Sequence, residues 1–195
     1  LTPAPDVAAL LSTAGFAGVE VLGRGVDRRQ FSPSRRDQWL RRQWGAGPET
    51  PVMLCVGRVA VEKNLSLAMG SYRQLKQSVP DLTLVIVGDG PCKAELAAQD
   101  SSIHWAGMQE GESLAAHYAS SDLFLFPSLT ETYGNVLAEA MASGLVTVSF
   151  DYAASHQLVR HEINGFQVPF GDHEAFHETV ALALRTRETW RRIGV

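Results

Sequence analysis

Five short apolar runs, separated by stretches of helical periodicity, constrain the fold of this chain more than any other feature. The runs are continuous rather than alternating, which is typical of strands that are covered by helices on both faces. The predicted strands are residues 52–56, 82–87, 103–105, 123–127 and 146–150. The predicted helices are residues 64–78, 92–99, 111–120, 134–143, 155–161 and 173–187. This order predicts an α/β fold with a doubly wound parallel sheet of the Rossmann-like kind.

The first fifty residues have a different character. A helix is predicted over residues 7–14 and a short strand over residues 19–22, and glycines and prolines then mark a linker that contains a short helix around Trp39. The core domain is therefore expected to begin near residue 51. With 195 residues, 45% of them hydrophobic, the chain can bury one good core. Because residue 1 is Leu, we expect a fragment or a processed piece.

Arginines crowd into the linker although the formal net charge of the chain is -4. They are Arg24, Arg28, Arg29, Arg35, Arg36, Arg41 and Arg42. No aromatic stacking platform or nucleic-acid motif accompanies them, so nucleic acid is not an expected partner. We predict a solvated linker face, with peripheral contact to a membrane surface as the alternative.

The remaining composition points to a protein of the cytoplasm. The sequence has neither an apolar run of transmembrane length nor a signal peptide. Cys55 and Cys92 lack metal-ligand spacing and a disulfide framework, and are expected to be buried or bystander thiols of a reducing compartment. The histidines show no ligand spacing either, so no metal site is predicted.

Candidate site residues follow the predicted strands, where doubly wound domains bind their ligands. Arg58 comes two positions after strand 52–56, and Lys63 comes five positions later. Two such cations are suited to clamp a diphosphate, although surface charge is the alternative. After strand 82–87, Gly88 and Gly90 permit a tight turn but do not form a dinucleotide fingerprint.

A second candidate site is the segment that follows strand 123–127. A loop with Gly134 leads into a predicted helix, an arrangement that leaves free N–H groups for an anionic ligand. If helical rise holds throughout, Glu131 and Glu139 lie roughly 12 Å apart, at about 1.5 Å per residue, and are placed to grip opposite ends of one extended ligand. Alternatively, Glu131 is a helix-start charge and Glu139 a solvated residue. The apolar residues around Glu139 favour a partnered carboxylate.

The segment from Glu131 to Gly144 resembles the E-x7-E signature of retaining GT-B glycosyltransferases of family 4, also called group 1. Further motifs similar to those of the family occur in order: Gly25–Asp27, Val56–Arg58, Glu62–Asn64, Val87–Pro91, Asp122–Pro127 and Asn164–Phe166. The resemblance covers nearly the whole chain from about residue 19. It implies that residues 1–50 are a remnant of an N-terminal domain with the interdomain linker, and that residues 51–195 are the C-terminal, nucleotide-sugar-binding domain.

The resemblance also implies residue roles. Arg58 and Lys63 match the residues that neutralise the pyrophosphate of the donor, Glu131 matches the one that binds sugar hydroxyls, and Glu139 the one that binds ribose. The other implied donor contacts are Gly57, Gly88, Gly90, Gly107, Met108, Thr132, Tyr133, Gly134, Asn135 and Val136. Amides near Asn135 and Val136 hold phosphate, and backbone groups at Gly107 and Met108 read the base. No metal and no cofactor are implied beside a UDP- or GDP-linked sugar donor.

The implied activity is transfer of a sugar from a nucleoside diphosphate to an acceptor hydroxyl with retention of configuration. The acceptor, a sugar or a lipid-linked molecule, is reached through the missing N-terminal half, so the fragment is expected to be inactive alone. Departures from the family pattern at Val146, Ala153, Ala154 and Gln157 leave the sugar open. The alternatives are a GT-B sugar-nucleotide epimerase, a non-catalytic sugar-nucleotide-binding module and a plain α/β interaction domain.

Overall fold

The structure is a computed structural model that describes residues 1–2, 5–23, 25–131 and 134–190. Its centre is a parallel sheet of six strands in the order β3-β2-β1-β4-β5-β6. The strands are β1 (Val52–Val56), β2 (Thr83–Val87), β3 (His104–Gly107), β4 (Leu123–Phe126), β5 (Val146–Phe150) and β6 (Phe166–Val168). The first three strands run outward from the centre in one direction and the last three in the other, which confirms the doubly wound fold.

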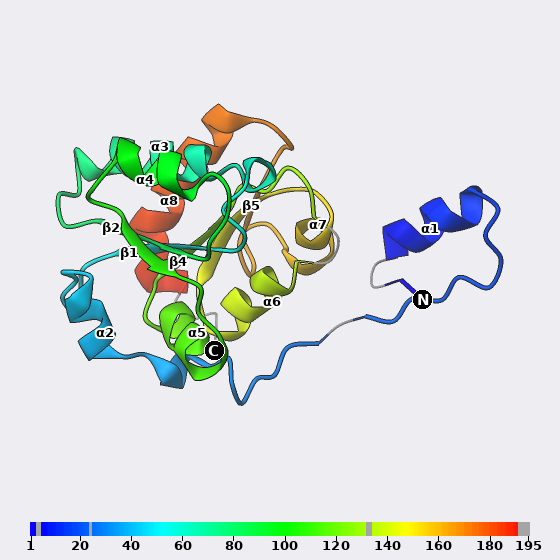
Figure 1. Ribbon diagram of the computed structural model, residues 1–195, viewed down its shortest axis with the longest axis horizontal. Helices are drawn as coiled ribbons and strands as arrows, with labels where there is room; N and C mark the ends of the chain where they lie inside the picture. Colours follow the sequence, from blue (N-terminus) through cyan, green and yellow to red (C-terminus); the bar gives the residue numbers. More distant parts are fainter. Residues whose placement is uncertain (3–4, 24, 132–133, 191–195) are drawn as a thin grey trace.

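Helices cover both faces of the sheet (Figure 1). The α-helices of the sheet domain are α3 (Leu65–Lys76), α4 (Lys93–Gln99), α5 (Gly111–Ala119), α6 (Asn135–Ala142), α7 (Ala154–Leu158) and α8 (His173–Trp190). Side chains of β1 alternate between two core clusters, with Met53 and Cys55 facing α3 and α8, and Val52 and Leu54 facing α5 and α6. Each strand is therefore buried on both faces, as its continuous apolar sequence predicts.

The boundaries predicted from the sequence hold for most elements. Strands β1 and β5 have the predicted bounds, and most of the other ends differ by one or two residues. Three larger differences occur. Residues 19–22 form no strand, because Val21 makes only an isolated bridge with Thr2. Strand β6 was not predicted, and the helix expected over residues 155–161 ends at Leu158.

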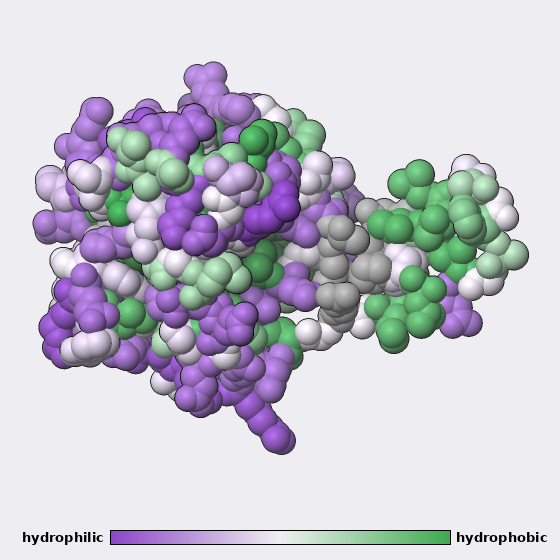
Figure 2. Space-filling view, viewed as in Figure 1, coloured by the Kyte–Doolittle hydropathy of each residue, from purple (hydrophilic) through white to green (hydrophobic). Residues whose placement is uncertain are grey.

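The N-terminal segment stands apart from the sheet body. Helix α1 (Pro5–Thr13) lies at the end of an extended stretch of chain (Figure 1). The surface of this segment is strongly apolar in Figure 2. The side chains of Leu10, Phe16 and Leu22 are each more than half exposed. A segment with this much exposed apolar surface is suited to pack against another surface.

The arginine-rich segment is only partly solvated. It forms the 3-10 helix η1 (Pro33–Arg35) and the helix α2 (Gln38–Gln43). Arg41 is fully buried, with its Nη1 atom 3.5 Å from Oδ2 of Asp122, and Arg36 lies 3.0 Å from the other oxygen of that carboxylate. The prediction of a solvated face was therefore wrong for these two residues. Exposed arginines of the segment are Arg28, Arg29, Arg35 and Arg42, whereas Arg24 lies outside the described residues.

Both cysteines are free thiols. Cys55 is buried within β1, and burial raises its pKa to about 12. Cys92 is partly exposed at the start of α4. Within the described ranges, no helix combines the length and the apolar character needed to cross a bilayer.

Candidate functional site

The candidate site lies at the carboxyl ends of β1 and β4. These two strands are neighbours at the point where the strand order reverses, and such a switch point opens a crevice for ligands. The loop after β1 contains the 3-10 helix η2 (Val61–Lys63). It touches the loop after β4 directly, because the Leu129 amide donates a hydrogen bond of 2.8 Å to the Glu62 carbonyl oxygen.

Lys63 and Glu131 meet at this crevice. The Nζ atom of Lys63 lies 2.8 Å from Oε2 of Glu131, and the two side chains are only 21% and 16% exposed. The same ammonium group lies 6.0 Å from the centre of the Phe126 ring. Two charges predicted from separate motifs, 68 positions apart in the sequence, therefore form one partly buried ion pair. Partial burial lowers the effective dielectric around the two groups, so their attraction is stronger than it would be in water.

Arg58 borders a neighbouring recess. Its Nη2 atom donates a hydrogen bond of 2.8 Å to Oε1 of Glu62, and its side chain is 66% exposed. The pKa of the Glu62 carboxyl lies below its ordinary value, first because of a hydrogen bond with its own backbone and then because of Arg58. The recess has a volume of about 470 Å³ and is lined by Val56, Gly57, Arg58, Val87, Gly88, Asp89, Met108, Gln109 and Leu114.

The loops that follow β1, β2 and β3 form the rim of this recess, and glycines let them approach each other closely. A Cβ atom on Gly88 would collide with the Gly57 carbonyl oxygen, and one on Gly90 would collide with the backbone of Val59. The Gly88 amide donates a hydrogen bond of 2.7 Å to the Gly107 carbonyl oxygen. The ends of β1, β2 and β3 are thus joined through their backbones, and the predicted residues Gly57, Gly88, Gly107 and Met108 come together here.

The start of α6 forms the other wall of the crevice. The helix begins at Asn135 after Gly134, which has a φ of 70° and itself has no side chain to cap this end. Glu131 therefore precedes the helix, and the separation expected from helical rise between Glu131 and Glu139 does not apply. A Cβ atom on Gly134 would come within 2.6 Å of the Ala154 Cβ atom and 3.5 Å of the Glu131 Cγ atom. The predicted contacts Thr132 and Tyr133 lie outside the described residues.

Glu139 has the partner that its apolar surroundings require. The hydroxyl of Tyr118 donates a hydrogen bond of 2.9 Å to Oε2 of Glu139. Burial raises the pKa of Glu139, while this hydrogen bond acts in the opposite direction. Tyr118 was not singled out from the sequence, because an aromatic residue on the inner side of a predicted helix has the pattern of an ordinary core residue.

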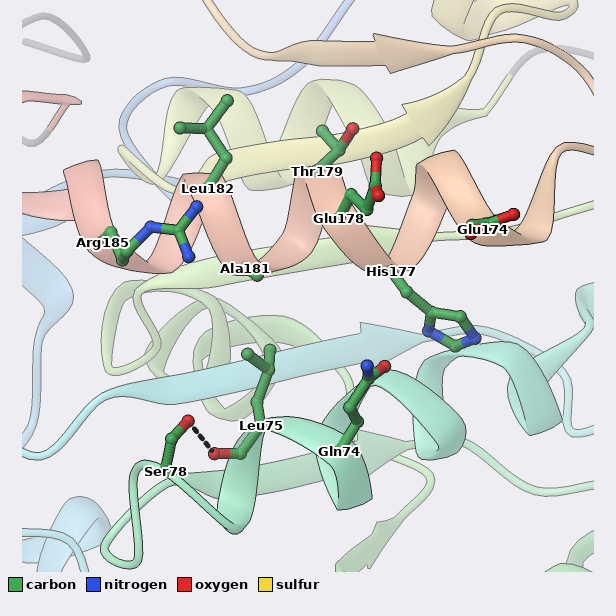
Figure 3. A pocket seen from close by; sticks show the side chains of 10 residues that line it. All are labelled: Gln74, Leu75, Ser78, Glu174, His177, Glu178, Thr179, Ala181, Leu182 and Arg185. Atoms are coloured by element: carbon green, nitrogen blue, oxygen red, sulfur yellow. Dashed lines mark hydrogen bonds between the residues drawn. The ribbon is translucent and has the colours of Figure 1, made fainter.

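Another recess, of about 860 Å³, lies between α3 and α8 (Figure 3). In Figure 3, His177 of α8 points toward α3, where its Nδ1 atom lies 2.7 Å from the Ser71 hydroxyl oxygen. Burial, together with the charge of His173, lowers the pKa of His177. The lining contains no residue from the predicted motifs and no strand end, so this recess is not the candidate site. Among the residues that the structure describes, no three His, Cys, Asp or Glu side chains gather to hold a metal ion.

The fold and the crevice together define the class, a Rossmann-like domain of the GT-B type. Solved structures with this fold include HepE of Anabaena in complex with UDP, with a TM-score of 0.84 and 22% identity over 99% of this chain and 56% of that one. Sucrose-phosphate synthase of Thermosynechococcus elongatus gives a TM-score of 0.83 and 22% identity over 99% of this chain and 50% of that one.

The sequence places the chain in a family. The family described as glycosyl transferases group 1 matches residues 50–186, and the chain belongs to it. Relatives include the sulfoquinovosyl transferase of Arabidopsis thaliana, 32% identical over 100% of this chain and 39% of the relative. The GDP-mannose-dependent alpha-mannosyltransferase of Mycobacterium tuberculosis is 34% identical over 89% of this chain and 45% of the relative. The chain therefore spans less than half the length of these curated relatives.

Proposed function

We propose that this chain is the donor-binding half of a retaining glycosyltransferase, which transfers a sugar from a nucleoside diphosphate to an acceptor hydroxyl. The observation that carries the proposal is the ion pair between Lys63 and Glu131 at the β1–β4 crevice. It combines a cation for the diphosphate with a carboxylate for the sugar at the ligand-binding edge of the sheet. Membership of the glycosyl transferases group 1 supports the reaction class.

Each part of the site then has a role in the reaction. Arg58 and Lys63 stabilise the negative charge that grows on the departing diphosphate, which is electrostatic catalysis by groups already in place. Glu131 binds hydroxyls of the transferred sugar. The start of α6, with the amides of Asn135 and Val136, holds phosphate oxygens. The donor is a UDP- or GDP-linked hexose, in keeping with the names of relatives and structural neighbours that print GDP-mannose and UDP.

Glu139 takes the ribose of the donor. A carboxylate is suited to two adjacent hydroxyls, because it accepts two hydrogen bonds at once. Its place on α6, one turn beyond the amides of Asn135 and Val136, supports this role.

The acceptor is bound by a second half of the enzyme. The exposed apolar residues Leu10, Phe16 and Leu22 of the N-terminal segment supply a surface for that half to cover. The acceptor is a sugar or a lipid-linked molecule, and the reaction takes place in the cytoplasm. Exposed arginines of the linker, such as Arg28 and Arg42, are suited to contact anionic lipid at the membrane surface.

Calorimetry of this chain with UDP, GDP and ADP, in the presence of a chelator, tests the proposal. UDP or GDP should bind without added metal, whereas binding of ADP alone would contradict the proposed donor. Arg58→Ala and Lys63→Ala should each weaken binding by about 1.5 to 3 kcal/mol, the range for hydrogen bonds to charged groups. The control is Arg42→Ala, which removes an exposed cation of α2 and should leave affinity unchanged. Unchanged affinity in both site variants would contradict the assignment.

A further inference from the structure

Tyr118 is a fully buried polar side chain that no motif of the site includes. It lies on α5 and belongs to the core cluster on that face of the sheet. Its ring is held edge-on by Phe31, with centroids 5.7 Å apart, and tilted against Phe124, with centroids 5.9 Å apart. Packing on both sides leaves the ring little rotamer freedom, so its hydroxyl oxygen has a fixed position.

The hydrogen bond from this hydroxyl has one direction. An ionised carboxylate only accepts, so Tyr118 donates its proton toward Oε2 of Glu139 over 2.9 Å. The described part of the chain supplies no second hydrogen bond to the Glu139 side chain. Oε2 is therefore tied to a rigid aromatic ring, while Oε1 makes no hydrogen bond with the described residues.

We propose that Tyr118 is a positioning residue for donor binding, whose hydroxyl anchors Oε2 of Glu139 so that Oε1 faces the ribose hydroxyls of the nucleotide. The inference rests on the role given to Glu139 under the proposed function. A glutamate side chain has three rotatable bonds, and fixing it before the ligand arrives reduces the entropy lost on binding. The same hydrogen bond favours the ionised form of Glu139 in surroundings that otherwise favour the neutral one.

Other titratable groups around α6 are occupied elsewhere. The elements packed against α6 are α5, α7, β4 and β5, and the two strands carry no titratable side chain. On α7, His156 lies 2.7 Å from Asp151. On α5, His117 donates from Nδ1 to the Ser113 carbonyl oxygen, and Glu112 lies 3.4 Å from Arg35. Among the described titratable groups of these elements, Tyr118 is the one that hydrogen-bonds to Glu139, so changing its hydroxyl alters the titration of Glu139 most directly.

The test compares Tyr118→Phe with Phe31→Leu in the whole chain. Tyr118→Phe removes the hydroxyl but keeps the ring, whereas Phe31→Leu loosens the same aromatic cluster and keeps the hydroxyl. Binding is measured by calorimetry from pH 4.5 to 8 with GDP or UDP, whichever binds more tightly to the wild type, and with the 2′,3′-dideoxy form of that nucleotide. Circular dichroism and thermal melting report the fold of each variant.

Tyr118→Phe should bind the ribonucleotide about tenfold more weakly than the wild type, as for loss of one hydrogen bond to a charged group. As the pH is lowered, the variant should also lose binding at a higher pH than the wild type does, because the neutral form of Glu139 is favoured when the hydroxyl is absent. Both proteins should bind the dideoxy nucleotide equally. Phe31→Leu should have a lower melting temperature than the wild type. The pH at which its nucleotide binding is half lost, the acid midpoint, should equal that of the wild type.

If Tyr118→Phe does not fold, 3,5-difluorotyrosine placed at position 118 keeps the ring and makes the hydroxyl a stronger donor. The acid midpoint of binding should then move to lower pH.

The possible results separate the two proposals. A wild type that binds neither GDP nor UDP overturns the proposed function. A wild type that prefers the ribonucleotide, with Tyr118→Phe matching it in affinity and acid midpoint, overturns the role of Tyr118 alone. If the wild type binds the ribonucleotide and the dideoxynucleotide equally, Glu139 does not contact the ribose. That result overturns the role of Tyr118 as well.

Discussion

Glu139 carries its charge where burial opposes ionisation, and this has a measurable effect on stability. Its pKa in the folded state lies above the ordinary value of 4.5, so the folded protein holds this proton more tightly than the unfolded chain does. The stability that comes from the protonated form is fully present below pH 4.5 and is lost as the pH rises through the folded pKa. At neutral pH the ionised Glu139 therefore lowers the free energy of unfolding.

Glu139→Gln should consequently stabilise the protein at pH 7. The amide oxygen still accepts the hydrogen bond from Tyr118, while the charge is removed. Urea unfolding should show a higher free energy of unfolding for the variant at pH 7, and no difference from the wild type once the pH falls below 4.5. A variant less stable than the wild type at pH 7 would contradict this account. Nucleotide binding should weaken in the same variant, so that the substitution raises stability and lowers function.

The sequence predicted some of these residues and not others, for a physical reason. Lys63 and Glu131 occur in short polar loops after apolar strands, a local signal that is visible without a structure. The buried charge of Arg41 depends on Asp122, which is 81 positions away. No local pattern distinguishes Arg41 from its exposed neighbour Arg42. Long-range partners of this kind also explain why Tyr118 was missed.

At the scale of the elements, one buried charge pair holds α2 against the sheet. Arg41 is fully buried and contacts Asp122, which precedes β4. The same carboxylate accepts a hydrogen bond of 2.9 Å from the Val52 amide at the start of β1. Asp122 thus joins three elements at the edge of the sheet opposite the candidate site.

Asp122→Ala should destabilise the fold by about 3–5 kcal/mol, because it leaves the buried guanidinium of Arg41 without its carboxylate. The control is Glu112→Ala, which breaks the exposed pair with Arg35 and should cost about 0–1 kcal/mol. Urea unfolding of the two variants against the wild type measures both effects. Similar losses in both variants would show that the buried pair contributes no more than the exposed one.

Element prediction worked where a segment carries its own signal. Strand β1 is a run of five apolar residues, and β5 is mostly apolar or β-branched; the predicted bounds of both were confirmed. Strand β6 has only three residues with Gln167 in the middle, too short for a periodic signal. Residues 19–22 have strand-like composition, but a strand also needs a neighbour with which to pair, and Thr2 supplies a single bridge. The pairing partner is a property of the fold and not of the segment.

For the whole molecule, the proposal predicts binding without transfer. Bringing donor and acceptor together across a cleft can supply roughly 7 to 11 kcal/mol of barrier reduction, and under the proposed function this chain forms only one wall of that cleft. The chain should bind a nucleotide sugar but transfer no sugar from it. A longer chain that includes an acceptor-binding half should form product with retained anomeric configuration, as followed by NMR of the product. Turnover by this chain at a rate near that of the longer protein would show that the catalytic machinery is complete within it.

The glycine rim of the site has a consequence for how donor preference can diverge. The loops after β1, β2 and β3 are joined through backbone groups at Gly57, Gly88 and Gly107, so their geometry depends little on neighbouring side chains. Met108 and Leu114 line the recess without forming those bonds. Substitutions at such positions can reshape the recess while its backbone frame stays in place. Under the proposed function, the preferred nucleotide base can therefore change through small substitutions that leave this backbone frame intact.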